Sequence, residues 1–125
     1  MISFTIEGLR LANTSNLREH WSQTARRAAD QRMIVTAHAR KAIHGASIAA
    51  PLRITVVRIG PGKMDRSNLY VTSKHVEDAL SALLGVDDGD EANWLLVCKQ
   101  ERPPKGASYK YAVRIEIESS AEVAS

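Results

Sequence analysis

The chain has 125 residues, of which 44% are hydrophobic and 25% are charged, and its formal net charge is +3. These values are typical of one soluble globular domain with a single core, and they leave too little chain for two ordinary domains. No run of about 18 apolar residues occurs, which excludes a transmembrane helix, and the single cysteine, Cys98, excludes an internal disulfide or a multi-cysteine zinc site.

The N-terminal part of the chain predicts a strand followed by a long helix. Residues 2–11 alternate, with Ile2, Phe4 and Ile6 on one face, which indicates a strand. This segment lacks a basic region followed by an uninterrupted apolar run, so we expect no signal peptide and a cytoplasmic protein. Residues 17–43 place apolar side chains at spacings of three, four and seven, which predicts an amphipathic helix.

The rest of the chain predicts three strands and a second helix. Residues 52–59 alternate and are rich in β-branched side chains, and the turn sequence "GPGK" ends this strand. A helix follows and ends at Gly85. The last two strands are expected at residues 94–102 and 109–118. The apolar stripe of the second helix consists of Leu69, Val76, Leu80 and Leu83.

The element order is therefore β-α-β-α-β-β. This order predicts an α/β (α+β) fold in which a four-stranded mixed sheet packs with two helices. We expect one domain over residues 1–118 and a disordered tail over residues 119–125.

Charge is distributed unevenly between the two halves of the chain. Residues 1–63 hold ten Lys or Arg and three Asp or Glu, whereas residues 64–125 hold seven and eleven. A basic half attracts polyanions, and an acidic cluster inside a basic protein is suited to a bound cation. This combination occurs in metal-dependent nucleases, although unevenly spread surface charge is an alternative explanation.

Acidic residues flank the second helix at both ends. Asp65 lies in its first turn, and Asp87 and Asp88 follow its last turn. A helix of about 16 residues is about 24 Å long, so its two ends in one chain cannot share a metal ion. Either the helix begins later, with "DRSNLY" lying extended beside the next strand, or a homodimer brings the acids of one chain near those of the other.

Carboxylates in this arrangement would bind Mg²⁺, which prefers hard oxygen ligands and usually takes only one or two protein carboxylates. Lys74 could then neutralise the charge that develops on a phosphate group. Structural roles are the alternative: Asp65 as a helix cap, residues 87–90 as a turn, and Lys74 in a surface ion pair with Asp78.

The ordered pattern of these residues resembles a known family. Asp65, Asn68-Leu69, Lys74, Asp78 and the run "ALLGVDDGDEANW" are similar to the motifs of the RusA family of Holliday-junction resolvases, in particular its phage and prophage members. The segments "SNLREHW" and "YAVRIEI" also resemble that family, so the likeness covers nearly the whole chain.

The resemblance implies a homodimeric endonuclease of DNA recombination and repair that binds four-way junctions and cuts them with Mg²⁺ or Mn²⁺. It implies that Asp65, Lys74 and Asp88 are catalytic and that Asp65, Asp87 and Asp88 are metal ligands. A two-fold dimer would also present two equivalent sites to the two equivalent strands of a junction.

One position departs from the family pattern. Ser67 stands where the family has a second motif aspartate, and a neutral hydroxyl is a weaker metal ligand than a carboxylate. We therefore expect reduced cleavage, or branched-DNA binding without cleavage. An unrelated small α/β interaction module, whose acids are caps and turns, is the third hypothesis.

Side chains that could contact DNA are spread along the chain, although each could equally be a solvated surface residue. His20 is a weaker candidate, because it could pack at the helix start instead. The main candidates are Arg18, Arg26, Arg27, Lys63, Arg66, Asn68, Lys99, Arg102 and Lys105.

Overall fold

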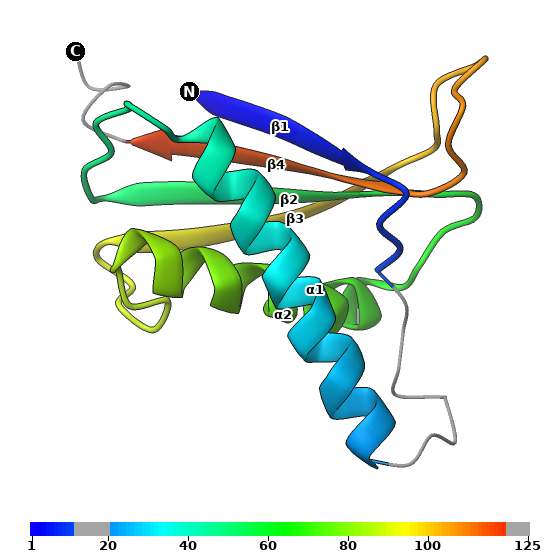
Figure 1. Ribbon diagram of the computed structural model, residues 1–125, viewed down its shortest axis with the longest axis horizontal. Helices are drawn as coiled ribbons and strands as arrows, with labels where there is room; N and C mark the ends of the chain where they lie inside the picture. Colours follow the sequence, from blue (N-terminus) through cyan, green and yellow to red (C-terminus); the bar gives the residue numbers. More distant parts are fainter. Residues whose placement is uncertain (12–20, 120–125) are drawn as a thin grey trace.

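The computed structural model describes residues 1–11 and 21–119 and confirms the predicted fold class and element order. Both helices lie on one face of a four-stranded mixed sheet (Figure 1). The elements are β1 (Ile2–Glu7), α1 (Trp21–Ala42), β2 (Leu52–Ile59), α2 (Arg66–Leu84), β3 (Trp94–Glu101) and β4 (Ala112–Ser119).

The strands are arranged in the order β1-β4-β2-β3. β2 and β3 are parallel, whereas β4 is antiparallel to both β1 and β2. Parallel neighbours need a long crossover connection, and α2 supplies it between β2 and β3. The carboxyl ends of β2 and β3 therefore reach the same edge of the sheet, which is called the carboxyl edge below.

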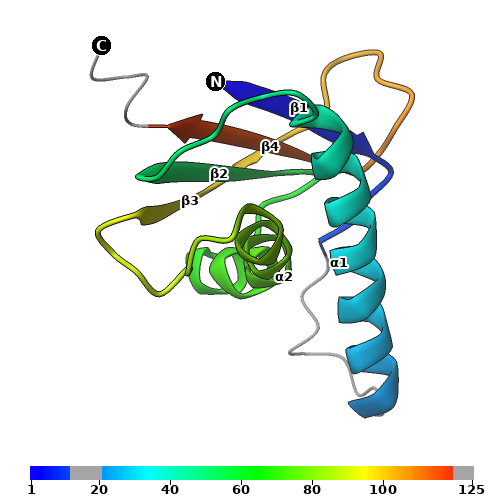
Figure 2. The same cartoon turned by 60° about the vertical axis from the view of Figure 1, so that its left-hand side comes forward.

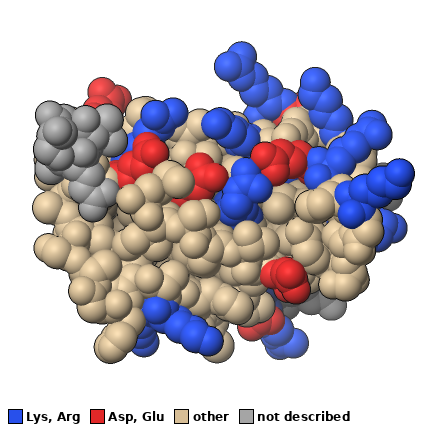
Figure 3. All heavy atoms as spheres, turned by 90° about the horizontal axis from the view of Figure 1, so that it is seen from above, with Lys and Arg blue, Asp and Glu red and all other residues tan. Residues whose placement is uncertain are grey.

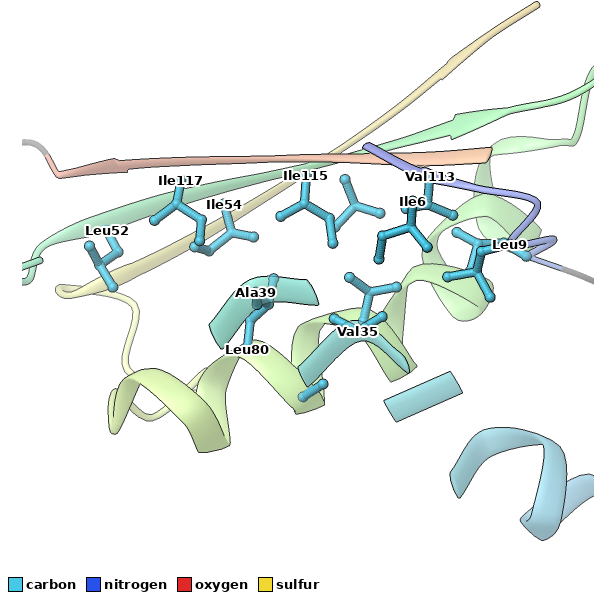
Figure 4. Packing of buried hydrophobic residues seen from close by; sticks show 14 of the residues in the cluster. Ile6, Leu9, Val35, Ala39, Leu52, Ile54, Leu80, Val113, Ile115 and Ile117 are labelled. Carbon is cyan, nitrogen blue, oxygen red and sulfur yellow. The ribbon is translucent and has the colours of Figure 1, made fainter. Parts of the chain in front are cut away.

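The core lies between the sheet and the two helices (Figure 4). Ile54 of β2 and Ile115 of β4 are fully buried there, facing Val35 of α1 and Leu80 of α2. α1 packs against α2 and β1, whereas α2 lies under β2 and β3 (Figure 2). This placement holds α2 along the two parallel strands.

No described helix covers the other face of the sheet, where a small cluster forms in which Tyr109 packs on Val57 and Ile59. Charged side chains form a band along one side of this face, and Lys and Arg side chains gather toward the carboxyl edge (Figure 3). Arg114 binds Glu101 there through paired contacts of 2.9 and 2.8 Å. The hydrogen bonds from Arg114, supported by its positive charge, hold the pKa of Glu101 below its ordinary value.

The first and last strands differ from their predicted limits. β1 ends at Glu7 and not at residue 11, because Gly8 adopts a left-handed backbone (φ 85°) and its N–H donates to the carbonyl of Tyr111 at 2.7 Å. Leucines 9 and 11 still reach the core from the segment beyond. β4 covers 112–119 instead of 109–118, and the hydroxyl of Ser119 donates to the carbonyl of Ala49 at 2.7 Å.

Some predictions concern residues outside the two described ranges. The predicted helix start at residue 17 and residues 120–125 of the predicted tail fall in these segments, whereas Ser119, also assigned to the tail, is a buried residue of β4. Within the described ranges, neither helix contains a stretch that is long and apolar enough to traverse a lipid bilayer.

Both ends of α2 are set by recognisable capping residues. Asp65 is the N-cap, with extended backbone angles, and its carboxylate accepts from the backbone N–H of Asn68 at 2.9 Å. Gly85 ends the helix in the left-handed conformation at φ 69°. Because α2 begins at Arg66, the alternative in which "DRSNLY" forms an extended approach is wrong.

Candidate functional site

Three acidic side chains meet beside α2. Glu77 and Asp78 belong to the helix, and Asp88 belongs to the loop that follows it. One carboxylate oxygen of each lies within 4.8 Å of those of the other two. These three residues, called the acidic cluster below, could hold a metal ion.

The chain reversal at Gly85 brings Asp88 back along the helix. The left-handed Gly85 turns the backbone, and the hydroxyl of Ser81 donates to the carbonyl of Val86 at 2.6 Å. Asp87 then accepts from the backbone N–H of Gly89 at 2.9 Å, which fixes the next turn. Local turn chemistry thus places Asp88 near side chains that lie ten or more residues earlier.

Glu77 is the buried member of the acidic cluster, with 5% of its side chain exposed. One carboxylate oxygen accepts from the indole N–H of Trp94 at 2.9 Å, and the other accepts from the ammonium of Lys74 at 2.9 Å. A buried carboxylate is tolerated when it has partners of this kind. Glu77 therefore ties α2 to the first residue of β3.

Lys74 lies between Glu77 and Asp88. Its ammonium nitrogen is 2.9 Å from a carboxylate oxygen of Glu77 and 3.8 Å from one of Asp88. The hydrogen bond to Glu77, which outweighs the effect of burial, raises the pKa of Lys74 above its ordinary value of 10.5. Over the described residues its ion pairs are with Glu77 and Asp88, so the predicted surface pair with Asp78 is wrong.

Asp65 lies apart from the acidic cluster and acts as a cap. One oxygen accepts from the Asn68 N–H and from the Ser67 hydroxyl at 3.1 Å, and the other accepts from the Asn68 side-chain amide at 2.8 Å. Nine residues separate Asp65 from Lys74, which corresponds to about 13 Å along a helix. Within one chain, the predicted catalytic residues are thus divided: Lys74 and Asp88 lie together and Asp65 does not.

The acidic cluster differs in membership from the ligand set expected from the sequence. Asp65 and Asp87 are not members, and Asp87 uses an oxygen in its own turn. Glu77 and Asp78 take their places. A signal for Glu77 was present in the sequence, because it lies four residues after Ser73 and three before Leu80, a spacing that places a carboxylate on the core-facing side of the helix.

The predicted DNA-contacting residues are not gathered in one place. Lys63, Arg102 and Lys105 are exposed at or near the carboxyl edge, where a pocket of about 220 Å³ is lined in part by Lys63 and Arg102. Arg66 is exposed in the first turn of α2 and Lys99 on β3, whereas Asn68 is half-buried. Arg26 and Arg27 lie in α1, and Arg18 and His20 fall outside the described residues.

Comparisons with known proteins add no assignment: no family model matches the chain, and neither does any curated protein. The function must therefore be inferred from the geometry of the acidic cluster and its surroundings.

Proposed function

We propose that the protein is a metal-dependent endodeoxyribonuclease that acts on branched DNA, as the resemblance to the RusA family implies. The observation that carries the proposal is the convergence of Glu77, Asp78 and Asp88 beside Lys74. Asp88 comes from the "LGVDDGD" run that resembles the family motif, and it lies next to the lysine of the same motif.

The donor chemistry of the acidic cluster suits a hard divalent cation. Carboxylate oxygens are the ligands that Mg²⁺ and Mn²⁺ prefer. When bound, such an ion would polarise a phosphodiester and lower the pKa of a water molecule. The chain supports this role because Trp94 holds Glu77 in place, and the fixed turn at residues 85–89 holds Asp88.

Lys74 has two roles in the proposal. In the free protein, its ammonium offsets the mutual repulsion of the carboxylates of Glu77 and Asp88. Because 41% of its side chain is exposed, Lys74 can also approach a DNA phosphate, where it would stabilise developing negative charge.

Asp65 enters the proposal only through a second subunit. In a homodimer, the Asp65 end of one α2 would approach the acidic cluster of the other chain, which would restore the ligand set expected from the resemblance. An exposed pocket of about 680 Å³, lined by Asp65, Ser67, Tyr70 and Val71, is compatible with such a contact.

A second candidate function is branched-DNA binding without cleavage. It is favoured by Ser67, whose hydroxyl donates to Asp65 where the family would supply another carboxylate. The oxygens of Asp65 are then engaged by local donors, and a metal ligand set is left with less negative charge.

One assay distinguishes these functions. The protein would be mixed with a four-way junction and with a linear duplex, each with and without Mg²⁺ or Mn²⁺. Nuclease function predicts metal-dependent cutting of the junction that Asp88→Asn abolishes and that Glu91→Gln, an exposed acid in the same loop, retains. Selective binding without cutting supports the second function, in which case Ser67→Asp should introduce cutting. If the protein neither bound nor cut the junction, both functions would be refuted.

A further inference from the structure

Arg58 occupies an unusual place in the sheet. It lies on β2 between Val113 of β4 and Gln100 of β3, on the face that the helices cover. The preceding residues on this face of β2, Ile54 and Val56, belong to the core. The alternation of the strand thus places an arginine where it would otherwise place an aliphatic side chain.

Two of the three nitrogens of the Arg58 guanidinium are buried without a partner among the described residues. Only 9% of the residue is exposed, and over the described part of the chain Nε and Nη1 have no hydrogen-bond acceptor. Its neighbour Gln100 is committed elsewhere, since its side-chain amide bonds both the N–H and the carbonyl of Met64 at 2.9 and 2.8 Å. A buried cation without an acceptor is costly, so such a group requires an explanation, and a bound anion is one that would also balance its charge.

The surroundings of Arg58 are cationic. Its Nη2 atom and the ring of Tyr111 both lie against Gly60, at 3.3 and 3.0 Å from the position a Cβ would take. The guanidinium of Arg10 stacks 4.7 Å from the centre of that ring, and the ammonium of Lys110 lies 5.6 Å from it. Three positive groups therefore share one corner at the carboxyl edge.

The nearest acids in sequence and register do not balance this charge. Glu101 is paired with Arg114 on the open face of the sheet. Both oxygens of Asp65 are used within the first turn of α2. Over the described residues Arg58 is thus left without an acidic partner, and a bound anion would supply its counter-charge.

We propose that Arg58 is the anchor of a phosphate-binding site at the carboxyl edge. A guanidinium offers parallel N–H groups that match two oxygens of a phosphate. Because Nε and Nη1 are covered, binding requires the turn at residues 60–63 to shift. Gly62 lies in that turn, is exposed, and has no neighbour within 4 Å of the position of a Cβ, so the shift would displace no packed side chain at this residue.

The phosphate has two possible sources. If the ligand is a phosphate of the DNA backbone, the site fixes where one DNA strand crosses the carboxyl edge. This version extends the proposed function and rests on it. A free phosphate or phosphate ester would occupy the same site whether or not the protein cuts DNA.

The first experiment measures phosphate binding alone. Inorganic phosphate should raise the thermal unfolding temperature of the wild-type protein relative to chloride at equal ionic strength. In Arg58→Met, phosphate affinity should fall about tenfold or more, as expected for the loss of charge-assisted hydrogen bonds. Arg53→Met is the matched control, because Arg53 is exposed on the open face of the same strand. Equal phosphate protection of wild type and Arg58→Met, or none in either, would overturn the site.

A second measurement covers the case in which Arg58→Met does not fold. The Nε–Hε NMR signal of Arg58, assigned by its loss in Arg58→Lys, should move as phosphate is added to the wild-type protein. A signal that stays in place at saturating phosphate refutes the site.

The salt dependence of DNA binding distinguishes a DNA backbone phosphate from a free phosphate as the ligand. If the ligand is a backbone phosphate, Arg58→Met should reduce the salt dependence of DNA binding by about one phosphate contact. An unchanged salt dependence, together with phosphate binding in the first experiment, assigns the site to free phosphate. Loss of junction cleavage in the assay above bears on the acidic cluster and leaves the phosphate measurement unaffected.

Discussion

The two ends of α2 both present carboxylates, but they use them differently. At the start of the helix, the oxygens of Asp65 accept from the Ser67 hydroxyl and from the backbone N–H and side-chain amide of Asn68. Toward the other end, Glu77 and Asp88 share their oxygens with Lys74. One carboxylate thus shapes the backbone locally, whereas the others are gathered from two segments around a cation.

This difference shows that the role of an acidic residue can be assigned only when its hydrogen-bond donors are known. A carboxylate that accepts from the free N–H groups of a helix start is already explained by capping. Carboxylates that are brought together repel one another and need a cation, and here the chain supplies Lys74. A divalent ion would compete with that ammonium for the same oxygens.

The largest expected effect tests whether Glu77 holds the site together. Glu77→Ala should lower the free energy of unfolding by about 2–4 kcal/mol, because it leaves the buried indole N–H of Trp94 without an acceptor and removes packed atoms. Urea denaturation would measure it. Asp78→Ala, at an exposed neighbouring position, should change stability by less than about 0.5 kcal/mol. If Glu77→Ala changed stability as little as Asp78→Ala, Glu77 would have no structural role.

A smaller effect is expected at the opposite end of the helix. Asp65→Ala should cost about 1 kcal/mol of stability, whereas Asp65→Asn should cost little, because asparagine is an equally good N-cap. The same urea titration measures both variants. If the alanine variant were as stable as the wild-type protein, the capping role of Asp65 would be wrong.

The two ends of α2 should also differ in their effect on metal binding. Asp88→Asn should change stability by about 0.5 kcal/mol or less, because its contact with Lys74 is long and partly exposed. It should nevertheless abolish any rise in unfolding temperature caused by Mn²⁺, which Asp65→Asn should leave intact in a monomer. If only Asp65→Asn removed the Mn²⁺ effect, the cation would bind at the helix start. If both variants removed it, the two ends would act together, as in the proposed dimer.

The smallest effect concerns alkaline pH. Because Glu77 raises the pKa of Lys74 in the folded state, this pair stabilises the protein fully below pH 10.5, and the contribution is lost as pH rises through the folded value. The stability of the wild-type protein should therefore fall faster above pH 10.5 than that of Lys74→Met. Lys41→Met, an exposed lysine of α1, should follow the wild-type curve. Parallel curves for Lys74→Met and wild type would contradict the pairing.

The sequence predicted the elements better than their arrangement. Alternation in residues 52–59 and the apolar stripe of α2 depend on local periodicity, so β2 and the end of α2 were predicted close to their observed limits. The order β1-β4-β2-β3 depends on pairing between distant segments, which periodicity does not encode. β1 was predicted too long because its leucines continue to face the core after Gly8 has ended the strand.

The candidate site was predicted only in part, because some of its contacts join segments that are distant in the sequence. Lys74 and Asp88 were expected to act together, and they lie within ion-pair distance. Glu77 was missed because its importance comes from Trp94, which lies 17 residues away and reaches it only after the chain has turned at Gly85. The unpartnered state of Arg58 was also beyond the sequence, because it depends on what surrounds the side chain in three dimensions.

The position of α2 also sets a minimum footprint. Arg66 lies at the carboxyl edge, and Glu77 lies eleven residues further along the same helix, or about 16 Å at 1.5 Å per residue. A single DNA strand that touched both the basic edge and the acidic cluster would have to follow the helix over about five nucleotides, at about 3.4 Å for each. Oligonucleotides shorter than this could reach either end of α2, but not both at once.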